Sequence, residues 1–355
     1  MNRSLPRIYL GTMTFGWNQS STFINSEVGT EFVKRALSAG VIYIDSARIY
    51  SGGATEPIVG QCIRNVISSS PEMIPEGGIR FTTKAHPSQP LGLSAAGLRN
   101  QLRESLDAMG ISFVDEFYLH QPDTENDLME SLEAANQLVK EGLVKRLGMS
   151  NYHESEVERA VFLCKEHGWT PPTIYQGLYN ALNRRCESAL LPVLRRHNID
   201  FIAYNALAAG LLTGKHQKGE EVKPGRFKNN PNYLPRYYTD ANFEALNIIQ
   251  SSLPSGMGIT TAAYKWLLQH SALRPSDGIL LGASSLEHLE NNLRDCIVAG
   301  ESDALPDETL AVFESAWAIC QRGDSFPYWR SYSKDHPGRE SMDPGASYSA
   351  AKKVV

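Results

Sequence analysis

Four side chains that could deliver a proton to a carbonyl oxygen lie at or just after the ends of three apolar segments. Asp45 and Tyr50 belong to VIYIDSARIY, Lys84 to IRFTTKAH and His120 to VDEFYLHQPD. These segments are consecutive predicted strands, and consecutive parallel strands are usually neighbours in the sheet, so their carboxyl ends should lie side by side. A tyrosine beside a lysine and a histidine is a proton donor for a carbonyl group under reduction. The pattern therefore indicates an oxidoreductase.

The expected chemistry depends on burial and charge. Lys84 follows an apolar strand, so its ammonium needs a carboxylate partner, and Asp45 is one strand away. That ammonium would stabilise the phenolate of Tyr50 and lower its pKa from about 10. His120 would orient the carbonyl oxygen. The alternative is a structural ion pair at the strand ends, with a tyrosine that only packs.

Eight short apolar segments alternate with amphipathic helical patterns along most of the chain. They are IYLGTMTFG, VIYIDSA, IRFTTKA, FVDEFYLHQ, VKRLGMSN, TIYQGLYN, IDFIAYNAL and DGILLGAS. Eight strand–helix units in order predict a closed (β/α)8 TIM barrel rather than an open sheet. The first turn, GTMTFGW, lacks the GxGxxG pattern of an open dinucleotide-binding sheet, and GLLTGKH is one residue short of a P-loop.

Two segments depart from this repeating pattern. From Leu211 to about Asn242 the chain is polar and rich in Gly, Pro and Asn, which predicts a long functional loop after the seventh strand. After the eighth unit, DETLAVFESAWAICQR predicts an extra C-terminal helix. The composition beyond it predicts a flexible tail. The expected organisation is a barrel over residues 1–330 and a tail over residues 331–355.

The composition of the 355 residues argues against several functional classes. A net charge of −5 disfavours general affinity for nucleic acid or an anionic membrane. The five cysteines are scattered, and no Cys or His pair has the spacing of a metal site. The N-terminus has no apolar run of signal-peptide length, and the longest apolar stretch, Phe201 to Leu212, is too short to span a bilayer. We therefore expect a cytoplasmic protein without a metal.

The segments around the four residues resemble those of a known family. DSARIYSGGATEPIVG, TKAHP and LHQPD are similar to the aspartate–tyrosine, lysine and histidine segments of the aldo-keto reductases. The resemblance runs from about Ile8 to Arg330. It implies a (β/α)8 barrel with a catalytic tetrad made of Asp45, Tyr50, Lys84 and His120.

The resemblance also implies a binding site for NADPH. Ser150 and Asn151 in GMSN and Gln176 in IYQGLYN would hold the nicotinamide carboxamide. Tyr204 in FIAYNAL would stack on the nicotinamide ring. AYNALAAGLLTGKH is similar to the family's cofactor-covering loop and adds to the expected cofactor-binding residues Asn205, Leu207, Gly210 and Lys215.

The phosphate end of this predicted site departs from the family pattern. In GASSLEHLENNL, Ser284 and Glu287 have the spacing of a capping box at a helix start, where free N–H groups bind anions. The family places a Lys and an Arg here, whereas this chain has Gly282 and His288, so the preference for NADPH over NADH stays open. Lys215 and Arg226 in the long loop could supply the missing positive charge to the pyrophosphate. The residues expected at this helix start are Ser284, Ser285, His288, Asn291 and Asn292.

Within the family, the nearest branch reduces aflatoxin dialdehyde and succinic semialdehyde. Its members end in a Tyr-aromatic-Arg sequence like residues 328–330. In that branch the arginines matching Arg236 and Arg330 hold a substrate carboxylate, a task that suits the guanidinium fork. Tyr233 and Trp17 are further candidates to line the substrate pocket. The resemblance implies NADPH-dependent reduction of aldehydes, and also of ketones, quinones or dialdehydes, with the tetrad tyrosine as proton donor.

Other functions stay open from the sequence. The same tetrad serves an alcohol dehydrogenase, including an aryl-alcohol dehydrogenase, or a reductase dedicated to one step of secondary metabolism. The β-subunits of potassium channels share the fold and most of the tetrad, yet serve chiefly as cofactor-binding partner proteins. Arg236 and Arg330 favour an enzyme acting on a small carbonyl compound, unless both are merely solvated. Homodimers occur in the resembled branch, but no interface motif identifies the oligomeric state here.

Overall fold

The fold is a closed barrel of eight parallel strands. The computed structural model describes residues 5–222, 225–228, 230–323 and 325–346. The strands follow each other around the barrel in chain order, and the last pairs with the first, which confirms the predicted (β/α)8 fold. The strands are β1 (Arg7–Gly11), β2 (Tyr43–Asp45), β3 (Arg80–Ala85), β4 (Val114–Leu119), β5 (Val144–Ser150), β6 (Ile174–Leu178), β7 (Asp200–Tyr204) and β8 (Gly278–Gly282).

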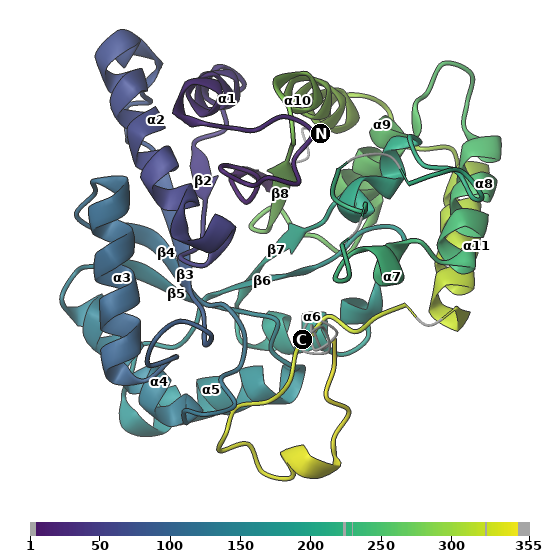
Figure 1. Ribbon diagram of the computed structural model, residues 1–355. Coiled ribbons are helices and arrows are strands. Elements are labelled where there is room, and N and C mark those ends of the chain that lie inside the picture. The colour runs from purple at the N-terminus through teal and green to yellow at the C-terminus, as the bar shows by residue number, and fades with distance from the viewer. Residues whose placement is uncertain (1–4, 223–224, 229, 324, 347–355) are drawn as a thin grey trace.

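Helices surround these strands, as Figure 1 shows. Those that follow β1 to β6 are α1 (Ser26–Ser38), α2 (Thr55–Ser69), α3 (Ala95–Met109), α4 (Leu128–Lys140), α5 (Glu154–His167) and α6 (Leu190–Arg196). Those after β7 and β8 are α7 (Leu234–Tyr237), α8 (Asp240–Ser252), α9 (Ile259–Lys265), α10 (Leu286–Glu301) and α11 (Asp307–Arg322). Because α11 packs along α8, the predicted extra helix widens one side of the barrel.

Helix α3 illustrates how the sequence specifies each unit. Ser94 accepts a hydrogen bond from the N–H of Gly97 and caps the helix start. Gly110 ends the helix with a φ of 71°, a conformation that glycine adopts without strain. The side chains that face the barrel and are buried there include Leu98, Leu102, Leu106 and Met109. The strands are covered on both sides, and β4 and β6 are buried at every residue.

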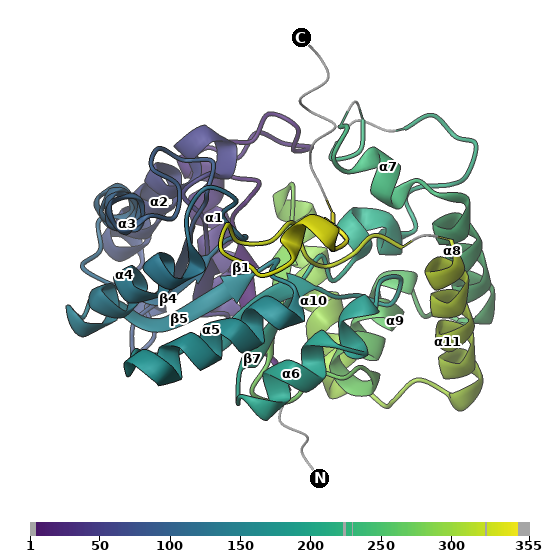
Figure 2. The same ribbon diagram turned by 90° about the horizontal axis from the view of Figure 1, so that it is seen from below.

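The long loop between β7 and α8 is present as predicted. Within its described residues it forms one 3-10 segment (Ala208–Thr213) and the single turn of α7. Figure 2 shows α7 near the top of the molecule, above the level of the strands. The loop is therefore positioned to cover the carboxyl ends of the strands.

The prediction of a flexible tail after Arg330 is wrong for residues 331–346. Tyr332 and Ser333 are 3% and 1% exposed. The N–H of Ala346 donates to the oxygen of Trp329 at 2.8 Å, so the segment returns to its starting point. Figure 2 shows this yellow segment above α5. Its polar composition resembles a tail, but its polar groups bind helices far away in the sequence; residues 347–355 lie outside the described part.

Membrane-spanning helices and metal-holding clusters are both absent from the described residues. No helix there combines the length and the apolar character needed to cross a bilayer. In the same ranges, no group of three His, Cys, Asp or Glu residues is arranged to hold a metal ion. All five cysteines are buried free thiols.

Candidate active site

Lys84 and Asp45 form a buried ion pair at the carboxyl ends of β3 and β2. Nζ of Lys84 lies 2.8 and 2.7 Å from the two carboxylate oxygens and 2.6 Å from the oxygen of Ser46. Both side chains are 0% exposed. Burial lowers the pKa of Lys84, and the adjacent Asp45 carboxylate opposes that shift. The predicted pair is present, and its three short contacts use all three ammonium donors.

Further donors complete the surroundings of the Asp45 carboxylate. The hydroxyl of Thr82 donates to Oδ1 at 2.7 Å, and Nε2 of Gln176 donates to the same atom at 2.9 Å. A carboxylate out of water needs such donors, because an unpaired buried charge is strongly destabilising. Gln176, expected to contact a cofactor, thus also belongs to the hydrogen-bond network of the ion pair.

Tyr50 lies in the turn after β2 and faces Lys84 and His120. Nζ of Lys84 is 5.2 Å from the centre of its ring, and the ring of His120 is 5.8 Å away, edge to face. Burial, followed by the charge of Asp45, raises the pKa of Tyr50 well above 10. The predicted net lowering is therefore wrong, because desolvation and the negative charge of Asp45 outweigh the stabilisation of the phenolate by the Lys84 ammonium. The phenol stays protonated.

His120 is held neutral by its surroundings. Burial, followed by the neighbouring His86 and Lys84, lowers its pKa well below 6.5. Within the described ranges, its buried Nδ1 has no hydrogen-bond partner. The ring of His86 lies 5.1 Å away, edge to face, and burial lowers the pKa of His86 to about 4. A neutral imidazole can orient a carbonyl oxygen without competing as an acid.

A second polar cluster, not predicted from the sequence, fixes the turn that carries Tyr50. The N–H of Arg48 donates to the oxygen of Lys84 at 3.2 Å, and its guanidinium lies 3.6 Å from the buried carboxylate of Glu56. Glu56 also accepts from the hydroxyl of Thr83 at 2.5 Å. These contacts join the turn to β3. The sequence signal for this cluster was the presence of Arg48 and Glu56 close to Asp45 and Tyr50 in DSARIYSGGATE.

The tetrad lies at one end of a cavity of about 910 Å³. Of the predicted residues, it is lined by Trp17, Tyr50, His120, Ser150, Asn151, Gln176, Tyr204, Asn205, Leu207, Gly210, Lys215, Arg226, Tyr233, Ser284, His288, Asn291, Asn292 and Arg330. Asp45 and Lys84 do not line it but contact residues that do. Lining residues that sequence reasoning missed include Met13, His86, Gln121, His216 and Arg294.

The polar ends of β5 and β7 form one hydrogen-bonded unit beside the tetrad. Nδ2 of Asn151 donates to the oxygen of His120 and to the hydroxyl of Ser150 at 2.8 and 2.9 Å. The hydroxyl of Tyr204 donates to Oδ1 of Asn151 at 2.7 Å. Asn151 has a φ of 62°, an uncommon conformation that Asn tolerates better than most residues. These contacts hold uncharged polar groups and an aromatic ring against the cavity.

The far end of the cavity meets the start of α10. Ser285, not Ser284, is the helix cap and accepts from the N–H of His288 at 3.2 Å, so the predicted capping box with Glu287 is wrong by one residue. Ser284 instead lines the cavity, with its hydroxyl 3.1 Å from Nδ1 of His288. Nζ of Lys215 lies 2.5 Å from Nε2 of the same ring. Burial, then the charge of Lys215, lowers the pKa of His288.

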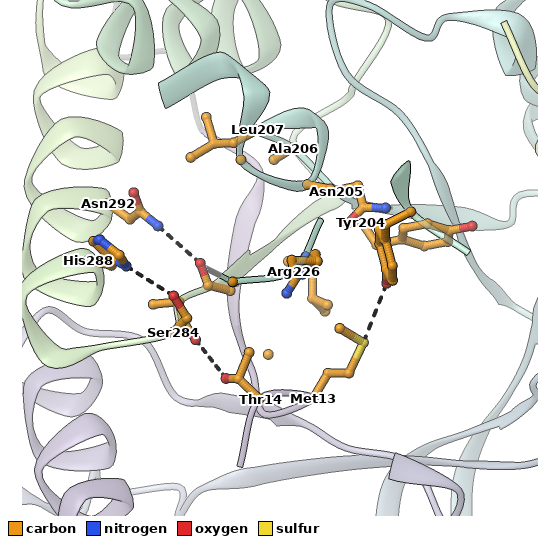
Figure 3. A pocket seen from close by; sticks show the side chains of 18 of the residues that line it. Met13, Thr14, Tyr204, Asn205, Ala206, Leu207, Arg226, Ser284, His288 and Asn292 are labelled. Carbon is orange, nitrogen blue, oxygen red and sulfur yellow. Dashed lines mark hydrogen bonds between the residues drawn. The ribbon is translucent and has the colours of Figure 1, made fainter. Parts of the chain in front are cut away.

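The long loop bridges the cavity. The guanidinium carbon of Arg226 lies 5.8 Å from the ring centre of Trp17 and 5.3 Å from that of Tyr233. Nδ2 of Asn230 donates to Oε1 of Gln19 at 2.9 Å. In Figure 3, Arg226 is drawn between the α10 residues and those that follow β7. The loop therefore joins the segment after β1 and encloses the space between.

The two predicted substrate arginines occupy different positions. Arg330 lines the main cavity, and its Nη1 donates to Oε1 of Gln121 at 3.2 Å. Arg236 does not line the main cavity; its guanidinium carbon lies 5.2 Å from the ring centre of Phe326. Both arginines line a small adjoining pocket of about 10 Å³. Of these two arginines, only Arg330 can contact a ligand in the main cavity in this conformation.

The residues around the cavity fit a nicotinamide dinucleotide. One end offers the amides of Asn151 and Gln176 and the ring of Tyr204, which suit a flat aromatic amide. The other end offers Lys215 and the start of α10, which suit phosphate groups. The cavity volume lies in the upper part of the range of about 300–1,000 Å³ typical of small-molecule sites.

Comparisons with known proteins agree with this geometry. Residues 7–312 match the Aldo/keto reductase family. Aflatoxin B1 aldehyde reductase member 2 from Rattus norvegicus is 36% identical over 327 residues, which cover 88% of this chain and 85% of that protein. Aldo-keto reductase family 7 member A3 from Homo sapiens is 36% identical over 332 residues, which cover 90% and 96%.

A solved structure adds an independent comparison of the fold. The glycerol dehydrogenase from Gluconobacter oxydans superposes with a TM-score of 0.71 at 22% sequence identity, covering 92% of this chain and 98% of that one. This structure shows the same fold, and the sequence relatives confirm the predicted resemblance to the aflatoxin-aldehyde reductases. The chain therefore belongs to the aldo/keto reductase family and is an oxidoreductase.

Proposed function

We propose that this enzyme reduces aldehydes to alcohols with NADPH, and that Tyr50 is the proton donor. The observation that carries the proposal is the position of the Tyr50 ring against both Lys84 and His120 at the cavity wall. The relative from Rattus norvegicus is named as an aflatoxin B1 aldehyde reductase, which supports the same substrate class.

The roles of the four residues follow from their charges. When bound, the reduced dinucleotide supplies a hydride to the carbonyl carbon. The carbonyl oxygen takes the hydroxyl proton of Tyr50, and neutral His120 orients that oxygen. The raised pKa keeps Tyr50 protonated until negative charge develops on the substrate, since an alkoxide is a stronger base than a phenolate. Lys84 then stabilises the phenolate until solvent returns a proton.

Selection of NADPH over NADH is assigned to the α10 end of the cavity. Lys215, which lies beside His288, provides a cation where the family's lysine and arginine are missing. Arg294 lines the same end and offers a second guanidinium, which lies 3.3 Å from the carboxylate of Asp295. An additional phosphate would be attracted by both, at a strength that falls with salt because the groups are exposed.

Aldehydes that carry a carboxylate are the proposed preferred substrates. Arg330 brings a guanidinium to the tetrad end. Burial is the main cause of the pKa shifts there; the charge of Arg330 adds to the lowering of the pKa of His86 and His120 and opposes the rise in the pKa of Tyr50. A carboxylate would pair with it in a two-pronged contact. Dialdehydes, ketones and quinones without a carboxylate would bind through the aromatic walls alone, and therefore more weakly.

The test is the variant Tyr50→Phe, assayed by loss of NADPH absorbance with 4-nitrobenzaldehyde and succinic semialdehyde. We expect kcat to fall roughly 10³-fold, because proton donation contributes about 10²–10⁴-fold, with the NADPH dissociation constant unchanged. Tyr43→Phe, at the other end of β2, is the matched control and should be fully active. Near-normal turnover by Tyr50→Phe would overturn the proposal.

A further inference from the structure

Arg330 is held by its backbone as well as by its side chain. Its N–H donates to the oxygen of Asn151 at 2.8 Å, next to the site residues at the end of β5. Upstream, the hydroxyl of Tyr328 donates to the carboxylate of Glu154 at the start of α5. Downstream come residues 331–346, here called the C-terminal strap. The position of the guanidinium therefore depends on what holds the strap.

The strap closes on itself directly behind Arg330. The N–H of Ser331 donates to the oxygen of Pro344 at 2.7 Å, and Arg330 forms an antiparallel bridge with Gly345. Gly345 has a φ of 75°, and a Cβ there would lie 2.5 Å from Cδ1 of Trp329. Ser331 has a φ of 58°, which is unfavourable for a residue with a side chain. Closure of the loop therefore maintains an unusual backbone turn next to the guanidinium.

The first anchor of the strap is on α5. The N–H and the hydroxyl of Ser333 donate to the two carboxylate oxygens of Glu156 at 2.8 and 3.0 Å. Glu156 is 0% exposed, and burial raises its pKa, while the hydrogen bonds from Ser333 oppose that shift. Since α5 begins just after Asn151, this anchor and the Arg330 backbone contact lie on one continuous unit of the barrel.

The second anchor joins α4 and α5. Oδ1 of Asp335 accepts from the N–H of Leu128, the first residue of α4, at 2.8 Å. Asp127, the residue at the cap position of α4, makes no side-chain capping bond. The same Asp335 carboxylate pairs with the guanidinium of Arg159 on α5. The Asp335 carboxylate therefore accepts the hydrogen bond that the cap residue of α4 does not accept. This contact stabilises the docked position of the strap.

We propose that the strap is a specificity-determining part of the site, in which Glu156 and Asp335 act as positioning residues that fix the Arg330 guanidinium for a substrate carboxylate. This inference rests on the proposed function. A guanidinium held before the substrate arrives loses less freedom on binding, so affinity for the carboxylate depends on the anchors. Neutral aldehydes make no such contact and should be nearly indifferent to them.

The test compares Asp335→Ala with Glu340→Ala, both in the full-length chain. Glu340 is a matched control, because it is a strap carboxylate whose side chain is 89% exposed. For Asp335→Ala we expect the KM for succinic semialdehyde to rise roughly 10-fold, equivalent to one well-placed charged contact. The kcat and KM for 4-nitrobenzaldehyde should change less than about 2-fold. Glu340→Ala should change neither substrate.

A double-mutant cycle with Arg330→Gln separates positioning from general damage. If Asp335 acts through Arg330, Asp335→Ala should cause little further loss in the Arg330→Gln background. Gly345→Ala tests the same idea without removing a charge, since it opens the closure at Trp329. It should also raise the KM for the semialdehyde more than the KM for 4-nitrobenzaldehyde.

The outcomes are distinguishable. Equal losses on both substrates by Asp335→Ala, or full additivity with Arg330→Gln, would mean that the strap only stabilises the fold, and the inference would fall. Unchanged kinetics in Asp335→Ala and Gly345→Ala would also overturn the inference, while the proposed aldehyde reduction would stand. A native enzyme that reduces 4-nitrobenzaldehyde but shows no preference for the semialdehyde would remove the carboxylate site and the strap's role together. Absence of turnover with either substrate would refute the proposed function itself.

Discussion

The two ends of the cavity are built in different ways. At the tetrad end, polar groups stand on strand termini, and the Lys84–Asp45 pair is 0% exposed. At the α10 end, Lys215 comes from a loop, and the side chain of Arg294 is 64% exposed. Contacts in water are weak and screened, whereas buried contacts are strong and intolerant of change. On the proposed function, the strand ends and the turn after β2 carry the chemistry, and exposed loops and helix ends select the cofactor.

The largest expected effect comes from breaking the buried pair with Lys84→Met. Asp45 would be left charged and without its main partner, which should lower the free energy of unfolding by about 3–5 kcal/mol. Turnover should fall at least about 10²-fold, because the phenolate of Tyr50 loses its cation. Urea unfolding and single-turnover reduction would measure the two effects separately.

The double variant Lys84→Met/Asp45→Asn is the control for this prediction. Removing both charges should restore most of the stability, because no unpaired buried charge remains, yet activity should stay low. If activity returned with stability, Lys84 would be only a structural residue.

Lowering the pH should have a smaller effect on the stability of the fold, through His86 at the tetrad end of the cavity. The pKa of His86 is about 4 in the fold, lowered by burial, then by the charge of Arg330, and about 6.5 when unfolded. Its contribution to stability is therefore complete above about pH 6.5 and is lost as the pH falls towards 4, by up to about 3 kcal/mol. Unfolding of the native chain and of His86→Asn should be compared between these limits. Parallel pH profiles for the two chains would contradict the assignment.

The smallest effect is expected at the α10 end, from Lys215→Met. The NADPH dissociation constant should rise roughly 5–10-fold at low salt and less at high salt, because one exposed cation is removed. Binding of NADH should be unchanged. Lys218→Met, in the same loop and paired with Asp240, is the matched control. An equal loss for both dinucleotides would show that Lys215 does not read the extra phosphate.

The fold and the tetrad end could be predicted because burial on both faces leaves a visible pattern. Each barrel strand appears as a short apolar run, and the polar residue that ends it points to the site, as with Lys84 and His120. The pKa of Tyr50 could not be predicted, because it depends on desolvation by residues from several distant segments. Residue type gives the charge of a neighbour but not the amount of water around it.

Two other features escaped prediction for different physical reasons. Ser284 and Ser285 are chemically identical, so spacing alone could not decide which one caps α10. The strap is polar and lacks a helical or strand period, and its anchors, such as Ser333 on Glu156, lie 177 residues away in the sequence. Composition cannot reveal partners at that separation.

The cap that Asp335 places on α4 also sets an order of events during synthesis. Leu128 and Asp335 are 207 residues apart, so the start of α4 leaves the ribosome long before its acceptor exists. At about 5–20 residues per second that interval is roughly 10–40 s. Throughout it α4 and α5 lack the contact that Asp335 makes with both, and Arg330 is added only five residues before Asp335. The nascent barrel can close before the proposed carboxylate-binding end is assembled, so that end of the site is completed last.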